Sequence, residues 1–181
     1  MPERGTIAMV SAVIIRASLP APLERLRRRS VADANQGVPA HMTLLYPFVE
    51  ATALDSSIRR QLASIARAHM PIDYRLAGPA AWPDTIYIAV DPAEPFQALQ
   101  ADLAGAFAAY PIYGREAGFA FVPHVTIAEG RFIENPRVIR SPAWDSLPAA
   151  GRADAIEVIA EDPDGRWRLQ WRMRLGPGAP R

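Results

Sequence analysis

The spacing of apolar residues along the chain predicts a mixture of short strands and amphipathic helices. Alternating or continuous β-branched runs predict strands at 7–17, 41–49, 72–78, 85–90, 119–128, 155–161 and 167–175. Apolar residues three or four apart predict helices at 22–34 and 54–69. The clearest helix has one apolar stripe, made of Phe96, Leu99, Leu103, Phe107 and Tyr110, and Asp91 is its expected cap. The proline-containing stretch 130–153 is expected to be irregular.

The last two predicted strands are separated by a turn at Pro163-Asp164-Gly165 and should form a hairpin. The final strand alternates strictly, with Trp167, Leu169, Trp171, Met173 and Leu175 on one face and Arg166, Arg168, Gln170, Arg172 and Arg174 on the other. An arginine face of this kind is typical of the solvated side of an antiparallel sheet. The alternative is a strip that contacts an RNA backbone.

One order of elements occurs twice in the chain. A strand, a helix and a strand span 7–49, and the same order spans 85–128. The second strand of each copy opens with Val-Pro and a His-x-Thr word: Val38-Pro39-Ala40-His41-Met42-Thr43 in the first copy and Val122-Pro123-His124-Val125-Thr126 in the second. This match indicates an internal duplication with one motif in each half.

Side chains two residues apart on a strand share a face, so His41 lies beside Thr43, and His124 lies beside Thr126. The motif face of the second strand otherwise carries the small residues Ala120, Val122 and Ala128, which would leave space for a ligand. A lone histidine is more often structural than catalytic, and His69, at the end of a predicted helix, is interpreted in that way. Two histidines in matched words favour a functional role instead.

Composition removes several kinds of chemistry. The chain of 181 residues has no cysteine, which excludes disulfides, thiolate catalysis and Cys-ligated zinc and is consistent with a cytoplasmic location. All 20 basic residues are arginine, which excludes lysine-dependent Schiff-base and P-loop chemistry. The net charge of +1 argues against a general nucleic-acid coat protein. No stretch is long enough to span a bilayer, so no membrane partner is expected.

The paired motifs suit the cleavage of a phosphate ester. One imidazole can take a proton from water while the other protonates the departing oxygen, because an unperturbed imidazole has a pKa near ~6.5. The threonine hydroxyls can donate to the non-bridging oxygens. No metal or other cofactor is expected, since there is no HExxH word, no cysteine and no local cluster of Asp and Glu beside the motif strands.

At these residues the chain resembles a known family. The words His41-Met42-Thr43-Leu44 and His124-Val125-Thr126-Ile127 are similar to the two His-x-Thr/Ser-hydrophobic signatures of the 2H phosphoesterase superfamily, which includes bacterial 2′-5′ RNA ligase-like proteins and 2′,3′-cyclic nucleotide phosphodiesterases. The stretch 122–128 is especially similar to the ligase-like branch, and the order of elements agrees from about 7 to 175. Many relatives carry a basic residue three positions after the second Thr; this chain has Glu129 there and Arg131 two residues later.

The resemblance implies an α+β fold: a bilobal, pseudo-two-fold duplication of β-α-β units, with antiparallel-rich sheets flanked by helices around a central cleft. We expect one domain over 1–175, with interleaved lobes whose motif halves span about 7–78 and 85–175, and a disordered tail at 176–181. The resemblance also implies that His41 and His124 act as acid and base and that Thr43 and Thr126 bind phosphate.

We therefore expect a metal-independent hydrolase of 2′,3′-cyclic phosphates on a nucleotide or RNA end. The same motifs would serve a 2′-5′ RNA ligase or another nucleotide phosphodiesterase, and a non-catalytic nucleotide- or RNA-binding module is the non-enzyme alternative. Trp82, Tyr113 and Phe119 could stack on a base or simply fill the hydrophobic layer, and Arg131 is a weaker candidate for substrate binding. The run 27–29 is expected to be a solvated helix face. A monomer is favoured.

Overall fold

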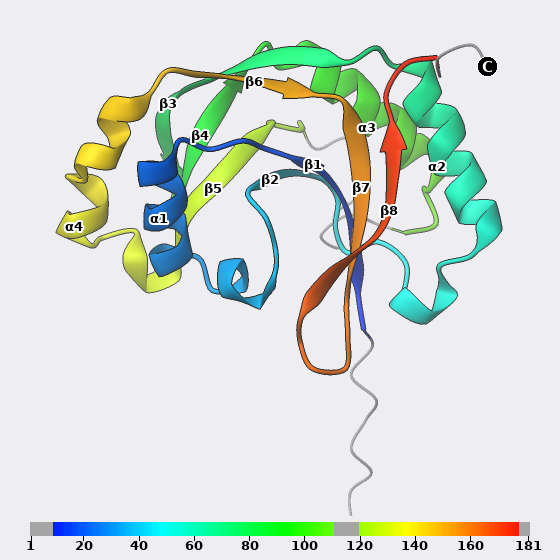
Figure 1. Cartoon of the computed structure of the whole chain (residues 1–181), viewed down its shortest axis with the longest axis horizontal. Coiled ribbons are helices and arrows are strands. Elements are labelled where there is room, and N and C mark those ends of the chain that lie inside the picture. Colours follow the sequence, from blue (N-terminus) through cyan, green and yellow to red (C-terminus); the bar gives the residue numbers. More distant parts are fainter. Residues whose placement is uncertain (1–8, 111–119, 178–181) are drawn as a thin grey trace, which may run out of the picture.

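The computed structural model describes residues 9–110 and 120–177, which form two antiparallel sheets with helices around them (Figure 1). The first sheet has the order β2-β1-β7-β8, made of His41–Leu45, Ser11–Arg16, Ala155–Glu161 and Trp167–Arg174. The second has the order β5-β4-β3-β6, made of His124–Glu129, Thr85–Asp91, Ile72–Trp82 and Ala149–Ala153. The α-helices are Ala21–Ser30 (α1), Ser56–Ala68 (α2), Glu94–Ala106 (α3) and Pro136–Ile139 (α4), and 3-10 helices include Asp33–Gln36 (η1) and Gly130–Phe132 (η4).

The duplication predicted from the sequence is confirmed by the topology. β1, α1 and β2 form one strand–helix–strand unit, β4, α3 and β5 form the other, and both pairs of strands are antiparallel. The motif strands β2 and β5 are edge strands of their sheets and lie next to each other. The α+β fold with a pseudo-two-fold repeat is therefore as expected.

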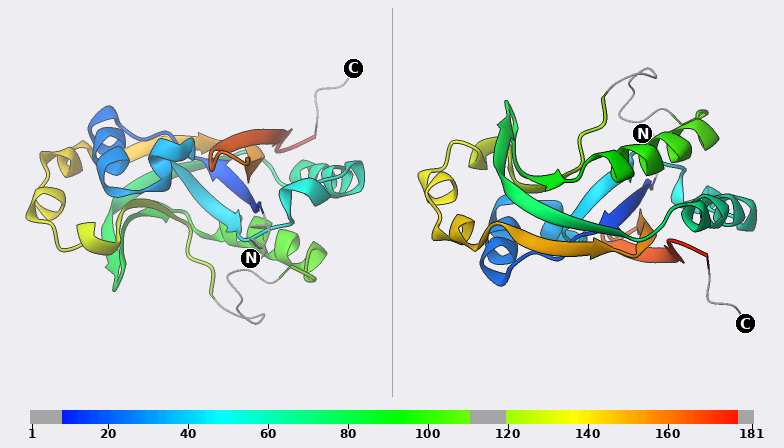
Figure 2. Two further views of the ribbon diagram at one scale, coloured as in Figure 1. Left: turned by 90° about the horizontal axis from the view of Figure 1, so that it is seen from below. Right: turned by 90° about the horizontal axis from the view of Figure 1, so that it is seen from above.

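Each sheet is completed by strands from the other half of the sequence. β3 pairs with β4 and β6 in the second sheet, although it precedes the second motif unit in the chain. The hairpin of β7 and β8, at the C-terminal end, joins β1 in the first sheet. The chain thus crosses from the first sheet to the second after β2 and returns to the first sheet after β6. Figure 2 shows the two sheets as two layers, and neither sheet contains strands from only one half of the duplication.

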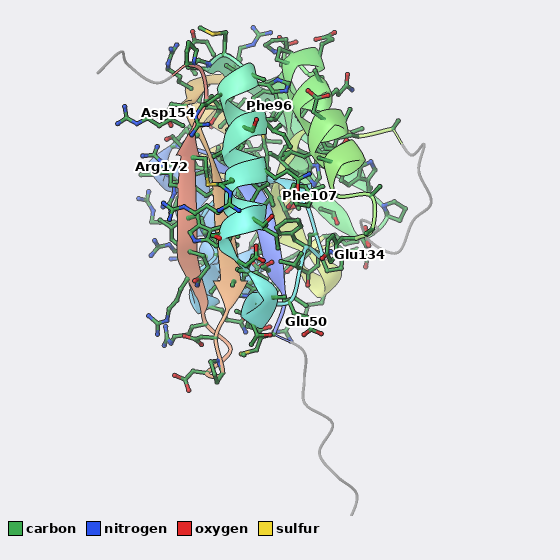
Figure 3. All side chains as sticks on the ribbon, turned by 90° about the vertical axis from the view of Figure 1, so that its right-hand side faces the viewer. Glu50, Phe96, Phe107, Glu134, Asp154 and Arg172 are labelled. Carbon is green, nitrogen blue, oxygen red and sulfur yellow. The ribbon has the colours of Figure 1, made fainter. Side chains whose placement is uncertain are left out.

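The faces that lie opposite the motif residues share one hydrophobic core. Met42 and Leu44 of β2 and Val125 and Ile127 of β5 are almost fully buried in it. Helices α2 and α3 cover this core at one end of the molecule, where α2 faces the viewer in Figure 3 and α3 lies beside it. Burial of these apolar residues fixes the motif side chains on the opposite face, because strand side chains alternate.

The two long helices begin in different ways. The Asp55 carboxylate caps α2 by accepting hydrogen bonds from the amides of Ser57 and Ile58, at 2.8 and 2.9 Å. The prediction that Asp91 caps α3 is wrong. Asp91 ends β4 and pairs with Arg75 at 3.1 Å, whereas α3 begins at Glu94 with a proline in its first turn, where no amide donor is required.

Strand β8 contains a β-bulge that the strict alternation of its sequence did not reveal. Val158 pairs with Trp171, but the next residue of β7, Ile159, pairs with Leu169, so Gln170 is an extra residue. A shift of one residue turns all following side chains to the other face of a sheet. The prediction of one continuous apolar face on this strand is therefore wrong.

The bulge divides the apolar residues of β8 between two faces. Trp171 and Met173 pack against the main core. Trp167 packs in a smaller cluster on the other face, which the strand pairing shows to be the face of His41 and Thr43. The aromatic ring at the start of β8 thus belongs to the side of the sheet that carries the first motif.

The three arginines of β8 are exposed, and two of them form ion pairs with neighbouring carboxylates. Arg168 contacts Asp162 at 2.6 Å, and Arg172 contacts Asp154 at 2.8 Å, the latter pair being labelled in Figure 3. The bulge also divides the arginines, because Arg168 pairs with Ala160 and Arg172 pairs with Glu157, and these two residues of β7 face opposite sides of the sheet. The prediction of one arginine face is therefore wrong, while the acidic partners of both arginines favour solvated ion pairs over an RNA-binding strip.

Several boundaries differ from those predicted. The strands expected at 7–17 and 119–128 are shorter in the described residues, and the stretch 130–153 contains α4 and the edge strand β6. Gly176, expected in a disordered tail, donates its amide to the carbonyls of Ala66 and His69 at 3.2 and 2.6 Å. Within the described residues no helix is both long and apolar enough to cross a membrane.

Candidate active site

The first motif lies on β2, where His41 has a hydrogen-bond partner at each ring nitrogen. Its Nδ1 lies 2.8 Å from the carbonyl of Pro39, and because a carbonyl only accepts, Nδ1 carries the proton. Its Nε2 lies 3.0 Å from the Thr43 hydroxyl, which donates to it when the ring is neutral. The reactive nitrogen of this imidazole is therefore Nε2.

The surroundings of His41 hold it in the neutral form. Burial lowers its pKa to about 4; the Pro39 carbonyl opposes this shift, while the positive charges of Arg27 and His124 add to it. At pH 7 the imidazole is thus uncharged and can accept a proton.

The second motif repeats this arrangement on β5. His124 Nδ1 lies 2.7 Å from the carbonyl of Val122, again two residues before the histidine, so its free nitrogen is also Nε2. Burial lowers the pKa of His124, and the Val122 carbonyl opposes the shift. The ring lies edge-on to Trp82, with centroids 4.6 Å apart, and 5.3 Å from the ring of Tyr87. Trp82 is thus close to the motif, as the sequence suggested.

A β-bulge follows the threonine of each motif at the same position. On β2, Ile14 pairs with Thr43 and Val13 with Leu45; on β5, Tyr87 pairs with Thr126 and Ile86 with Ala128. The extra residues, Leu44 and Ile127, both stand three positions after the motif histidine and are both buried. The duplication therefore includes this irregularity of the strands.

The bulges change which residues share the motif face. Ala128, expected beside Thr126, is instead fully buried in a cluster with Ile86 and Val138. The residues five positions after each histidine, Tyr46 and Glu129, are turned toward the cleft. The expectation of a small residue at 128 on the motif face is wrong, and a tyrosine and a glutamate occupy equivalent positions.

A cleft of about 420 Å³ lies along the motif face of the first sheet and reaches β5. Its walls come from β1, α1, η1, both motif strands and the β7–β8 hairpin; the lining side chains are Ala12, Arg27, Val31, Asp33, Gln36, Val38, His41, Thr43, Tyr46, Thr126, Glu129, Ile159, Glu161 and Trp167. His124 precedes Thr126 by two residues on the same face of β5. The cleft has the volume of a small-ligand site and draws on both copies of the duplication.

Arg27 is a buried cation in this cleft that the sequence analysis did not identify. The side chain is only 2% exposed, donates to the Val38 carbonyl at 3.1 Å and lies 3.7 Å from the Asp33 carboxylate. Burial lowers the pKa of Arg27 and raises that of Asp33. The expectation of a solvated face at 27–29 is wrong for this residue, because Arg27 follows the buried Leu23 by one helical turn.

The remaining candidates lie elsewhere. Arg131, in η4, is exposed with its guanidinium 5.0 Å from the ring centre of Phe132, and it does not line the cleft. Tyr113 and Phe119 lie outside the described residues. His69, which was given no function, ends α2 and pairs with Asp102 of α3 at 2.8 Å.

Several solved structures share this fold. A protein of Thermus thermophilus, TT0787, superposes with a TM-score of 0.64 at 19% identity, covering 94% of this chain and 100% of the other. LigT of E. coli in complex with 3′-AMP gives a TM-score of 0.57 at 16% identity, covering 93% and 99%. Usb1 of Kluyveromyces marxianus gives 0.50 at 12% identity, covering 92% and 98%. At these identities the likeness establishes the fold alone.

The family is established by the sequence itself. No curated protein matches the chain significantly in a direct sequence comparison. In contrast, the family model of the 2′-5′ RNA ligase superfamily matches residues 15–168, which is most of the chain. Together with the two-sheet fold and its LigT-like neighbours, this match shows that the chain belongs to the 2′-5′ RNA ligase superfamily of 2H phosphoesterases.

Proposed function

We propose that this protein hydrolyses 2′,3′-cyclic phosphates of a nucleotide or an RNA end, with His41 and His124 as the acid–base pair. The observation that carries the proposal is the matched geometry of the two histidines. Each donates Nδ1–H to the carbonyl two residues upstream, so each keeps Nε2 for proton transfer on the side of its motif threonine. A hydrolysis that needs one base and one acid requires two such groups.

His41 is the better general base of the two. Its pKa of about 4 keeps it neutral at pH 7, and the charge of Arg27 opposes its protonation. In the proposed reaction, His41 Nε2 takes a proton from a water molecule whose oxygen attacks phosphorus. His124, which is protonated at Nε2 once the bound anionic phosphate has raised its pKa, gives that proton to the ribose oxygen as its bond to phosphorus breaks, and the product is a phosphate monoester. Solvent exchange then returns both imidazoles to their starting state.

Thr43 and Thr126 are suited to hold the phosphate. Their hydroxyls lie beside the two histidines on the motif faces and both line the cleft. The Thr43 hydroxyl, which donates to His41 Nε2, would donate to a non-bridging phosphate oxygen instead, because a charged acceptor forms the stronger hydrogen bond. That exchange frees Nε2 for water at the moment when the substrate is bound.

Related chemistry is the enzyme alternative to this proposal. A 2′-5′ RNA ligase or another nucleotide phosphodiesterase would use the same pair of imidazoles and hydroxyls. LigT has been crystallised with 3′-AMP, with ATP and with NADP+, so a structural relative of this chain accepts nucleotides. A binding module without turnover is the non-enzyme alternative, and an intact acid–base pair weighs against it.

The proposal is tested with purified protein and the four 2′,3′-cyclic mononucleotides. We expect hydrolysis that persists in EDTA, since the imidazoles supply both proton transfers and the described residues contain no group of three or more His, Asp or Glu placed to hold a metal ion. His41→Ala and His124→Ala should each reduce kcat by ~10²–10⁴-fold. Thr43→Ala and Thr126→Ala should also weaken product binding, by roughly 1–3 kcal/mol.

The matched control for these substitutions is His69→Ala, which removes an imidazole at the end of α2 and should leave kcat unchanged. Near wild-type turnover in both His41→Ala and His124→Ala would show that the chemistry lies elsewhere. Nucleotide binding without any turnover by the wild type would establish the binding module. Loss of activity in EDTA with recovery on adding zinc or manganese would identify a metal-dependent enzyme.

A further inference from the structure

The far end of the cleft is built by segments that do not carry the motifs. Glu161, the last residue of β7, pairs with Trp167, the first residue of β8, and both side chains line the cleft. Directly paired residues have Cβ atoms roughly 4.5–5.5 Å apart, so a carboxylate and an indole ring stand together. The bulge at Gln170 is what turns this end of β8 toward the cleft.

The loop of η1 closes this end from the other side. Gly37, which follows η1, has a φ of +103° and passes so close to the Trp167 backbone that an added Cβ would lie 2.6 Å from the Trp167 carbonyl oxygen. This approach requires glycine and holds Gln36 at the same end of the cleft. The Tyr46 ring completes the wall, with its centroid 6.3 Å from that of Trp167.

The carboxylate at this end has no protein partner among the residues that the structure describes. Glu161 is half-buried, yet its side chain makes no hydrogen bond or ion pair with any residue of the described ranges. The adjacent arginine of the hairpin, Arg168, is already paired with Asp162 at 2.6 Å. A partly desolvated carboxylate is an acceptor without a donor, and a ligand with N–H groups would supply the missing hydrogen bonds.

The position along the sheet fits a base rather than a phosphate. Thr43 pairs with Ile14, Ile14 pairs with Glu157, and Glu161 lies four residues further along β7. At about 3.3 Å per residue this is roughly 13 Å along the strands, and β7 lies two strands, roughly 10 Å, across the sheet from β2, so the backbones of Thr43 and Glu161 are roughly 16 Å apart. The two side chains extend into the cleft and take up part of this distance, and a phosphate, a ribose and a base would span the rest.

We propose that this end of the cleft is a nucleobase subsite selective for guanine. The face of the Trp167 indole stacks on the base, and the two oxygens of Glu161 accept hydrogen bonds from guanine N1–H and N2–H. Guanine is the base whose edge presents two adjacent donors. Adenine, cytosine and uracil would each turn an acceptor toward one oxygen of the carboxylate, which disfavours them. The proposal rests on the proposed function, because it places the phosphate at His41, Thr43 and Thr126.

The test compares kcat/KM for 2′,3′-cyclic GMP, IMP, AMP and UMP, together with calorimetric binding of 3′-GMP and 3′-IMP. Inosine lacks only the 2-amino group, so cyclic GMP should be favoured over cyclic IMP by about 10–100-fold, the value of one hydrogen bond to a charged group. Glu161→Gln should abolish that preference, and Trp167→Leu should raise KM for every base. Asp164→Asn, in the exposed hairpin turn, is the matched control and should behave like the wild type.

The outcomes separate this inference from the proposed function. The guanine subsite is refuted if all four cyclic nucleotides are hydrolysed with equal kcat/KM. It is also refuted if the preference for guanine persists in Glu161→Gln. Neither result contradicts the proposed hydrolysis of cyclic phosphates. Absence of hydrolysis refutes the proposed function. In that case, tighter binding of 3′-GMP than of 3′-IMP that is lost in Glu161→Gln still supports the subsite, and equal binding refutes it as well.

Discussion

The neutral state of His41 can be tested through the stability of the protein. Its pKa is about 4 in the folded chain and about 6.5 when exposed. As pH falls below 6.5, His41 becomes protonated in the unfolded chain but stays neutral in the folded chain. The free energy of unfolding therefore decreases between pH 6.5 and pH 4 and levels off below pH 4. At pH 4.5 the loss from this one group is roughly 2.5 kcal/mol, as the linkage relation gives for a shift of this size.

The measurement is urea denaturation at pH 7 and pH 4.5 for the wild type and His41→Gln. The variant has no imidazole at this position, so its unfolding free energy should decrease by about 2.5 kcal/mol less than that of the wild type. Met42→Leu, a volume-conserving change at the next residue, is the control and should keep the wild-type pH dependence. Equal pH dependence in the wild type and His41→Gln would refute the burial of a neutral imidazole at this position.

Two further predictions concern the walls of the cleft. Arg27→Met should lower the free energy of unfolding by about 1–3 kcal/mol, because it removes the donor to a buried carbonyl and the partner of a half-buried carboxylate. Arg28→Met, on the exposed face of α1, is the control and should change the free energy of unfolding by about 0.5 kcal/mol or less. Similar values for both variants would contradict the inward position of Arg27. Gly37→Ala should lower the free energy of unfolding by about 1–3 kcal/mol, because the added Cβ would contact the Trp167 backbone and Gly37 has a positive φ. Gly105→Ala, in α3, is the control: its Cβ has open space, so the substitution should be neutral or slightly stabilising. Denaturation curves that do not separate the two variants would argue against the close approach of Gly37 to the Trp167 backbone.

The sequence predicted the duplicated motif strands because their signals are local. His41 and Thr43 alternate with buried Met42 and Leu44, and such period-two patterns identify a strand with one packed face. The repeated Val-Pro and His-x-Thr words then related the two halves without knowledge of any long-range contact. The fold class followed from this local information together with the family resemblance.

The bulges and the composition of the cleft could not be predicted in the same way. An extra residue at Leu44, Ile127 or Gln170 arises from pairing between strands, and nothing in the spacing of a single strand marks it. Each bulge reverses the side on which later residues lie, which is why Glu129 and Trp167 entered the cleft unexpectedly. Edge strand β6 was missed for a related reason, since its sequence is rich in alanine and glycine and lacks a strand pattern.

A duplicated site that performs acid–base catalysis must also break its own symmetry, because two identical imidazoles at one pKa cannot serve efficiently as both acid and base. Here the symmetric parts are the strands, the bulges and the Nδ1–carbonyl hydrogen bonds, and the asymmetry comes from their neighbours. His41 is affected by the buried cation of Arg27, whereas His124 is flanked by the rings of Trp82 and Tyr87. A nearby positive charge disfavours the imidazolium, while aromatic faces tolerate it. A negatively charged phosphate between the motifs would raise both pKa values, and the ring without the cation would be the first to gain a proton. In the proposed mechanism, the division of roles between the two histidines is thus set by residues outside the repeated words.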